Sequence, residues 1–138
     1  MSEQNKQYAY FSLHGDFDPD AITARVGVNP TEAWRKGDLH PRNRLERKLS
    51  HWALHSRLSD DDSIESHISD VLLQLSMNEI EFIRLSTEIG GCMQLVGYFH
   101  DGYPGLNFSS DLVLGLAKFK LSIDFDFYNL WSDAREAT

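Results

Sequence analysis

Two acids and a phenol alternate along the last strand-like segment of the chain, Leu121 to Tyr128. Successive residues of a β-strand point to opposite faces, so Asp124, Asp126 and Tyr128 share one face and apolar side chains share the other. Carboxylates two residues apart on a strand lie about 6.5–7 Å apart, close to the carboxylate spacing of glycosidases. The same pattern is typical of a solvent-exposed or partner-binding sheet face. We favour the second interpretation, because two acids on one strand occur constantly.

The first strand-like segment carries further groups that could transfer protons. From Tyr8 to His14 the chain alternates, with apolar residues on one side and Tyr10, Ser12 and His14 on the other. If this strand lies beside the terminal strand, a carboxylate, a phenol and an imidazole come within reach of one another. The sequence therefore predicts a polar sheet face that suits either recognition or proton transfer.

Three carboxylates lie close together in the sequence DFDPD, at Asp16, Asp18 and Asp20. Alternating acids can supply oxygen ligands to a hard cation. A calcium loop also needs a bidentate Glu at its twelfth position, and counting from Asp16 that position is Gly27. The pattern instead predicts a helix from Pro19 to Val26, with Asp18 as its N-cap and Gly27 after its end. We therefore expect no metal at this segment.

Two other patterns are associated with metal binding or nucleophilic catalysis. His51 and His55 have the spacing of metal ligands on a helix, but their segment alternates like a strand, where four residues span about 13 Å. The two imidazoles then lie too far apart to bind one zinc ion. Cys92 is the only cysteine, which excludes an internal disulfide, and it begins an apolar strand where a buried, inert thiol is typical. We expect no metal, no cofactor and no Cys-His nucleophile.

Trp34 and Trp52 differ in their surroundings. Trp52 alternates with polar residues in a strand, so we expect it in the core. Trp34 lies among polar residues between Pro30 and Gly37, where a core position and an exposed anchor for a partner are equally consistent with the sequence. The Gly102–Gly105 loop is a further candidate contact region, although turn chemistry also explains its composition.

The remaining periodicities predict the elements that position these residues. Between Val28 and Arg57 two strands flank a basic loop, and helices alternate with strands from Asp60 onward. The predicted segments are a strand over Ser50–Arg57, a helix after Asp60–Ser63 that carries Ile64, Ile68, Val71, Leu72 and Leu75, a second helix capped by Asn78 and extending to Glu88, a strand near Cys92–His100, a loop over Asp101–Asn107, and a helix from Ser110 with Leu112, Val113, Leu116 and Phe119 on one stripe. Together they predict an α+β fold with a mainly antiparallel sheet and helices packed on one face.

The chain is expected to form a single domain over residues 1–138, with an ordered core of about residues 8–131 and short polar tails. No repeat, low-complexity tract or Pro-, Gly- or Ser-rich linker divides it. We expect the tail from Ser132 to Thr138 to be frayed. Folding at this length buries roughly 65–70% of the unfolded surface, so the core needs no disulfide.

Charge and hydropathy exclude several classes of partner. Thirteen Lys and Arg residues against 21 Asp and Glu give a formal net charge of -8, which disfavours nucleic acid and anionic membranes. The basic cluster of Arg42, Arg44, Arg47 and Lys48 is interrupted by Glu46 and is typical of a solvated loop. No apolar run reaches the about 18 residues of a membrane span, and the polar N-terminus is unlike a secretory signal. We expect a cytoplasmic protein with no nucleic-acid or membrane partner.

An ordered set of motifs resembles a known family. The motifs are the string GDFDPDAITARVGVNP that ends at Pro30, then Trp34, the Lys36-Gly37-Asp38 step, Trp52, and the IDFDFY string that ends at Tyr128. The chain resembles the bacterial domain-of-unknown-function family numbered 4279, from about Tyr8 to Tyr128. The resemblance implies a small bacterial cytosolic α+β domain, and it assigns no catalytic role to Asp18, Trp34 or Asp124. Some such small domains are suspected immunity proteins of contact-dependent toxin systems.

The composition and motifs favour a binding domain over an enzyme. We hypothesise a non-enzymatic module whose acidic, aromatic surface engages a protein, with an immunity-type inhibitor of a basic toxin as one concrete version. The alternative is a small-molecule-binding protein or hydrolase that uses an Asp/Tyr/His sheet face. The candidate binding residues are Tyr10, His14, Asp18, Trp34, Asp124, Asp126 and Tyr128.

Overall fold

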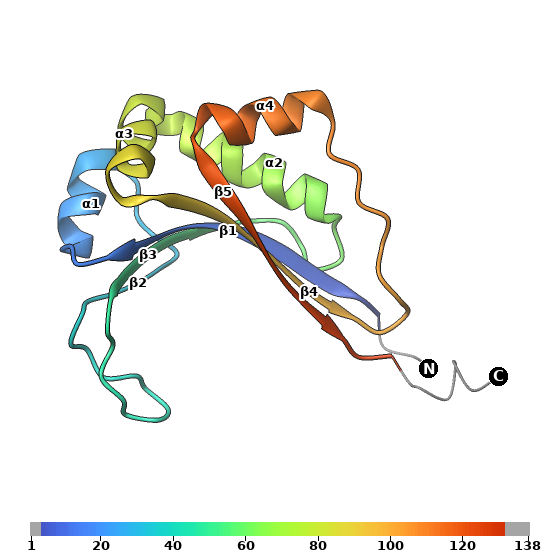
Figure 1. The fold of residues 1–138 in the computed structure, drawn as a ribbon, viewed down its shortest axis with the longest axis horizontal. Helices are drawn as coiled ribbons and strands as arrows, with labels where there is room; N and C mark the ends of the chain where they lie inside the picture. The colour runs from blue at the N-terminus through green and yellow to red at the C-terminus, as the bar shows by residue number, and fades with distance from the viewer. Residues whose placement is uncertain (1–3, 132–138) are drawn as a thin grey trace.

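The computed structural model describes residues 4–131, so the expectation of a frayed tail over residues 132–138 lies outside the described residues. Helices are interspersed with strands along the chain (Figure 1). In order, the elements are β1 (Lys6–Gly15), α1 (Pro19–Val26), β2 (Glu32–Trp34), β3 (Ser50–His55), α2 (Ile64–Leu75), the 3-10 turn η1 (Ser76–Asn78), α3 (Glu79–Ile89), β4 (Gly91–Phe99), α4 (Ser110–Lys118) and β5 (Leu121–Asn129).

The strands form one five-stranded sheet in the order β2-β3-β1-β4-β5. All neighbouring strands are antiparallel except β4 and β5, which are parallel. The four α-helices lie together on one side of this sheet (Figure 1). This arrangement confirms the predicted α+β fold with a mainly antiparallel sheet and helices on one face.

The strand order corrects one expectation. β1 does not lie beside β5, because β4 pairs with both of them. Tyr10 is opposite Gln94, and Gln94 is opposite Asp124. Tyr10 and Asp124 therefore lie on the same face but two strand spacings apart, about 9.5 Å.

The DFDPD segment forms the helix start that its residue types predict. The Asp18 side chain accepts a hydrogen bond from the Asp20 N–H at 2.9 Å, and Pro19 begins α1. Gly27 ends α1 with a left-handed φ of 69°, a conformation that glycine adopts without steric cost. Helix α2 begins in the same way at Ser63, whose side chain accepts from the Ser66 N–H. Both helix predictions are confirmed.

The core lies between the sheet and the helices. Trp52 is fully buried, as predicted, and its indole N–H donates to Thr23 Oγ1 at 3.0 Å. Phe11 packs edge-to-face against both Trp52 and Phe82, which joins β1 and β3 to α3. Other core residues come from the helix-facing positions of β1, β3 and β4: Ala9, Leu13, Leu54, Met93, Leu95 and Phe99.

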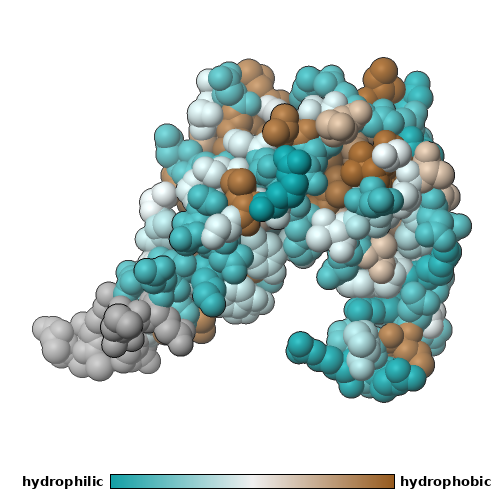
Figure 2. Space-filling view, turned by 180° about the vertical axis from the view of Figure 1, so that it is seen from behind, coloured by the Kyte–Doolittle hydropathy of each residue, from teal (hydrophilic) through white to brown (hydrophobic). Residues whose placement is uncertain are grey.

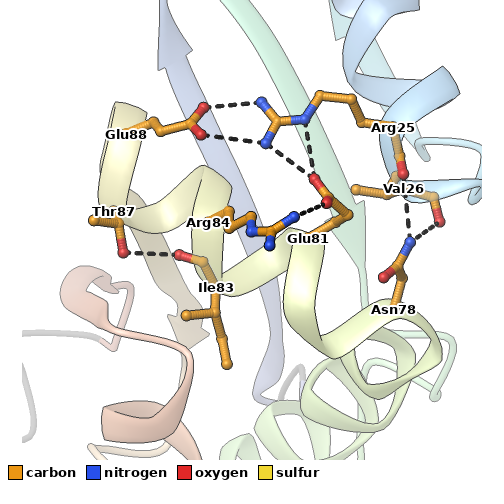
Figure 3. Close-up of polar contacts among 8 residues, drawn as sticks. All are labelled: Arg25, Val26, Asn78, Glu81, Ile83, Arg84, Thr87 and Glu88. Carbon is orange, nitrogen blue, oxygen red and sulfur yellow. Dashed lines mark hydrogen bonds and ion pairs between the residues drawn. The ribbon is translucent and has the colours of Figure 1, made fainter.

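Helices α1 and α3 are fastened to each other by polar contacts (Figure 3). Arg25 of α1 lies between two acids of α3, at 3.0 Å from Glu81 and 2.9 Å from Glu88. Asn78 takes the N-cap position of α3 as predicted, but its side chain makes no capping hydrogen bond. Its amide instead donates to the carbonyl of Val26 at 3.2 Å, at the end of α1. The two helices thus support the β1–β3 end of the sheet as one unit.

One further boundary and one further face differ from expectation. β1 begins at Lys6, inside the expected polar N-terminal tail. The Asn5 side chain accepts hydrogen bonds from the N–H groups of His100 and Asp101, which holds this end of β1 beside the end of β4. Val113 is half exposed, so the apolar stripe of α4 consists of Leu112, Leu116 and Phe119 without it. The described helices include none that is long and apolar enough to cross a membrane.

Candidate functional site

No described helix lies over the sheet face opposite the helical layer (Figure 1), and we call it the open face. Seen from behind, the molecule is hollowed beneath the sheet, between a projecting loop and the far end of the strands (Figure 2). The alternation of β1 and β5 places the predicted side chains Tyr10, His14, Asp124, Asp126 and Tyr128 on this face. Further residues share this face: Glu32, Trp34, His51, Ala53, His55, Cys92, Gln94, Val96, Tyr98 and Ser122.

A row of stacked rings crosses three strands at one end of the open face. Trp34 is opposite His51, and His51 is opposite His14. The Trp34 and His51 rings stack with centroids 4.1 Å apart, and the Nδ1 atoms of His51 and His14 lie 3.3 Å apart. Glu32 Oε1 lies 2.9 Å from His51 Nε2. His51 is therefore held between a carboxylate and a second imidazole.

The electrostatics of this row keep both imidazoles neutral near pH 7. Burial, and after it the neighbouring His14, lower the pKa of His51 to about 4 against the opposing effect of Glu32. Burial also lowers the pKa of His14. A neutral His14 can accept or donate one hydrogen bond to a ligand in the hollow, but it carries no charge for ion pairing.

Trp34 fastens the 35–49 hairpin, the segment that joins β2 to β3 and projects from the sheet (Figure 1). Its indole N–H donates to the Leu49 carbonyl at 3.1 Å, and the Arg47 guanidinium lies 3.7 Å from its ring centroid. The ring is thus half-buried between His51 and Arg47. Through these contacts Trp34 positions the hairpin. It lies neither in the core nor free at the surface.

Asp18 lies away from the open face, and its carboxylate already has partners within the chain. Besides capping α1, it forms an ion pair with Arg35 of the 35–49 hairpin. Arg35 also pairs with Asp20, and Lys36 lies 3.2 Å from Asp16. The acids of the DFDPD segment therefore hold the base of the hairpin. The structure does not bring Asp18 together with the other predicted site residues.

Three rings stack in the middle of the open face. Tyr10 and His55 are opposite each other in register, with ring centroids 4.5 Å apart, and Tyr8 lies 5.7 Å from His55. Burial raises the pKa of Tyr8 to about 12, and burial followed by the charge of Glu32 raises the pKa of Tyr10. Burial lowers the pKa of His55. This stacked cluster is neutral near pH 7 and half-buried, which suits a contact surface better than a proton-transfer site.

Small side chains lie next to this cluster, where Ser12 pairs with both Ala53 and Cys92. Burial raises the pKa of the Cys92 thiol above its usual range, so little thiolate exists at neutral pH. Cys92 is half-buried on the open face, whereas its strand pattern predicts a buried thiol.

The acids lie at the other end of the sheet, on the edge strand β5. Asp124 and Asp126 are exposed, and the Tyr98 and Tyr128 rings stack beside them with centroids 5.0 Å apart. A hydrogen bond with Asp126 raises the pKa of Tyr128. Because β4 lies between them, Asp124 and Asp126 do not share one site with the imidazoles of His14 and His51.

Several open-face residues were outside the predicted set. The even-numbered side chains of β4, Gln94 and Tyr98 among them, follow from the alternation of a strand that the sequence does predict. Nothing in the sequence predicts that Glu32 lies on this face, because β2 is only three residues long and shows no measurable alternation. His51 and His55 drew attention as metal ligands, whereas the structure places them in ring stacks on a strand.

Outside the open face, a depression on the helical side and the Gly102–Gly105 loop are further surface features. Among residues 4–131, no group of three or more His, Cys, Asp or Glu side chains could hold a metal ion. An open depression of about 580 Å³ lies on the helical side, lined by residues of α2 and of the segment 107–112. Its Glu65 accepts a hydrogen bond from the Asn107 N–H, which ties the segment to α2. The Gly102–Gly105 loop presents the exposed Tyr103, which packs edge-to-face on Phe99.

The fold and the face together define a small α+β domain with one helical layer and an aromatic, acid-edged open sheet face. The family model described as domain of unknown function (DUF4279) matches residues 5–130, and the chain belongs to this family. This confirms the resemblance carried by the GDFDPD and IDFDFY strings. No curated protein and no solved structure matches the chain.

Proposed function

We propose that this domain is a protein-binding module and that the open face is its binding surface. The observation that carries the proposal is the uncovered, hollowed sheet face, on which aromatic and imidazole rings are already stacked against one another. Tyrosine and tryptophan are enriched at protein interfaces because they combine a large apolar area with a polar group. Rings held in stacks lose little rotamer freedom on binding, which lowers the cost of association.

The charges support a basic partner. Asp124 and Asp126 are exposed at the β5 end of the open face, and the chain carries a net charge of -8. Exposed acids at the rim of an interface accelerate encounter with a positively charged protein. A basic toxin held by an immunity-type inhibitor is one concrete form of such a complex. The hydrolase hypothesis has less support, since burial raises the pKa of the Cys92 thiol and β4 separates Asp124 and Asp126 from the imidazoles.

The test is a pull-down from native cell extract at low and at moderate salt, with the wild-type chain and the Asp124→Asn/Asp126→Asn variant. A matched control, Asp101→Asn/Asp111→Asn, removes the same charge from exposed positions off the sheet face. We expect a basic protein that is retained by the wild type and the control, is lost from the β5 variant, and dissociates as salt rises. The association rate of the purified pair should fall about tenfold in the β5 variant.

Two outcomes would contradict the proposal. One is equal retention by the β5 variant and the wild type at both salt concentrations. The other is a purified chain that carries a bound small molecule and no protein, with the small molecule lost on Asp124→Asn/Asp126→Asn substitution. That second result would instead support the small-molecule hypothesis.

A further inference from the structure

The strand β5 has a free backbone edge. It is nine residues long, and within residues 4–131 it pairs only with β4. Its central residues 122–126 are all exposed. An edge of this length presents unpaired N–H and C=O groups that can pair with another strand, and proteins normally shield it.

The shield on this edge is the Asp124 carboxylate. The Phe125 N–H donates to Asp124 Oδ1 at 3.1 Å, so this N–H is directed away from β4. Alternate residues of a strand direct their backbone groups to opposite edges, so Ile123 and Phe127 face the free edge as Phe125 does. One exposed carboxylate therefore covers one of the three N–H groups along this part of the edge.

The two faces of β5 differ sharply in chemistry. Asp124 and Asp126 point to the open face, whereas Ile123 and Phe125 point to the helical side. The helices do not reach over these apolar residues, and Ile123 is 38% and Phe125 54% exposed. A strand that paired with β5 would extend both faces, one beside acids and one beside uncovered apolar side chains.

We propose that β5 accepts an extended strand of the partner protein, with basic residues alternating with apolar ones. This inference rests on the proposed function and specifies how the partner binds. Basic side chains of the added strand would lie opposite Asp124 and Asp126, and its apolar side chains would cover Ile123 and Phe125. Its backbone would take the Phe125 N–H and release the Asp124 carboxylate for ion pairing.

A second copy of this chain does not fit the same edge. Antiparallel pairing of β5 with itself around Phe125 places Asp124 opposite Asp126 of the other copy, and parallel pairing also sets acids beside acids. Like charges directly opposite each other destabilise a strand pair. The acids therefore disfavour self-association and select a strand of opposite charge.

The test uses a nine-residue capped peptide of alternating Lys and Val as the probe. Titration calorimetry should show saturable binding that weakens with salt, and hydrogen exchange of the Ile123, Phe125 and Phe127 amides should slow about tenfold or more. A peptide with Glu in place of Lys should not bind. Absence of slowed exchange on β5, or equal binding of the Glu peptide, would overturn the inference.

Two matched comparisons isolate the backbone contacts. Phe125→Pro removes an N–H that β4 does not use, so the strand should survive, whereas Phe125→Ala removes only the side chain. The Pro variant should lose at least about tenfold more affinity than the Ala variant. In the peptide, N-methylation of one alternating set of residues should abolish binding and methylation of the other set should spare it. Equal effects of the two methylation sets would overturn the inference, and this comparison holds even if the Pro variant fails to fold.

The two proposals fail differently. A natural partner that binds Phe125→Pro as well as Phe125→Ala, but not Asp124→Asn/Asp126→Asn, would overturn strand addition and leave the open face as the binding surface. A partner that binds the Phe125 variants and Asp124→Asn/Asp126→Asn as tightly as the wild type would overturn both proposals.

Discussion

The Nδ1 atoms of His14 and His51 lie 3.3 Å apart across the β1–β3 pair. At this distance one ring must donate and the other accept, because two N–H groups or two lone pairs would repel each other. Glu32 lies on the far side of His51, at 2.9 Å from Nε2. Protonation of both imidazoles would place two cations in contact, only one of which has a carboxylate neighbour.

Stability should therefore fall as the solution is acidified. The pKa of His51 is about 4 in the folded chain and about 6.5 when unfolded, so between these values the unfolded state binds more protons. The free energy of unfolding should be greatest above pH 6.5 and should decrease toward pH 4, by an amount on the order of 3 kcal/mol at most. The lowered pKa values of His14 and His55 act in the same direction. Urea denaturation at several pH values measures the change.

The His51→Gln variant isolates this effect. It should unfold with a clearly shallower dependence on pH than the wild type. Identical slopes for His51→Gln and the wild type would show that the imidazole pair does not govern acid stability.

Trp34 should control the order of the 35–49 hairpin. Its ring stacks on His51 and under Arg47, contacts that together contribute about 1–2 kcal/mol. Trp34→Ala should therefore raise the rate of tryptic cleavage after Arg42, Arg44 and Arg47 about tenfold or more, with little change in the circular dichroism of the rest of the chain.

Trp34→Phe provides the matched comparison, because it keeps a ring for stacking and loses the hydrogen bond to Leu49. Its cleavage rate should fall between those of the wild type and Trp34→Ala. If Trp34→Ala is cleaved at the wild-type rate, the ion pairs of Arg35 and Lys36 hold the hairpin without the ring.

The faces of the strands could be predicted from the sequence, but their order could not. A period of two in β1 and β5 assigns each side chain to a face whatever the neighbouring strand is. Neighbours are set by contacts between distant segments, and nothing local marks β4 as the strand between Tyr10 and Asp124. One physical signal does exist: acids such as Asp124 and Asp126 within an apolar strand are typical of an edge, where they discourage pairing.

The candidate site was predictable where it depends on alternation and not where it depends on tertiary contacts. Tyr10, Asp124 and Tyr128 lie on the open face because their strands alternate. The occupation of Asp18 by Arg35 depends on how the hairpin folds back on α1, which no sequence period encodes.

The Cys92 thiol should react slowly with a disulfide reagent such as DTNB. Burial raises its pKa, so the thiolate fraction at pH 7.5 is smaller than that of a free cysteine. We expect a rate about tenfold or more below that of the urea-unfolded chain. Asp124→Asn should increase the rate modestly, since the Asp124 charge also raises the pKa of this thiol. Equal rates for folded and unfolded chains would contradict the burial of the thiol.

Tyr10 and the β5 acids should affect different steps of partner binding. Tyr10 is half-buried and stacked on His55 in the middle of the open face, whereas Asp124 and Asp126 are exposed near its edge. Truncation of a central ring removes short-range packing, so Tyr10→Ala should raise the dissociation rate of the captured partner about tenfold or more and leave the association rate nearly unchanged. Asp124→Asn/Asp126→Asn should do the reverse at low salt.

Surface plasmon resonance at two salt concentrations separates these effects. Tyr103→Ala is the control, because this exposed tyrosine lies in the loop after β4 and outside the open face. If Tyr103→Ala raises the dissociation rate and Tyr10→Ala does not, the partner contacts the Gly102–Gly105 loop and the open face is the wrong surface. If Tyr10→Ala instead lowers the association rate, the Tyr10 ring contributes to the first encounter with the partner, and the stacked cluster does not anchor the complex.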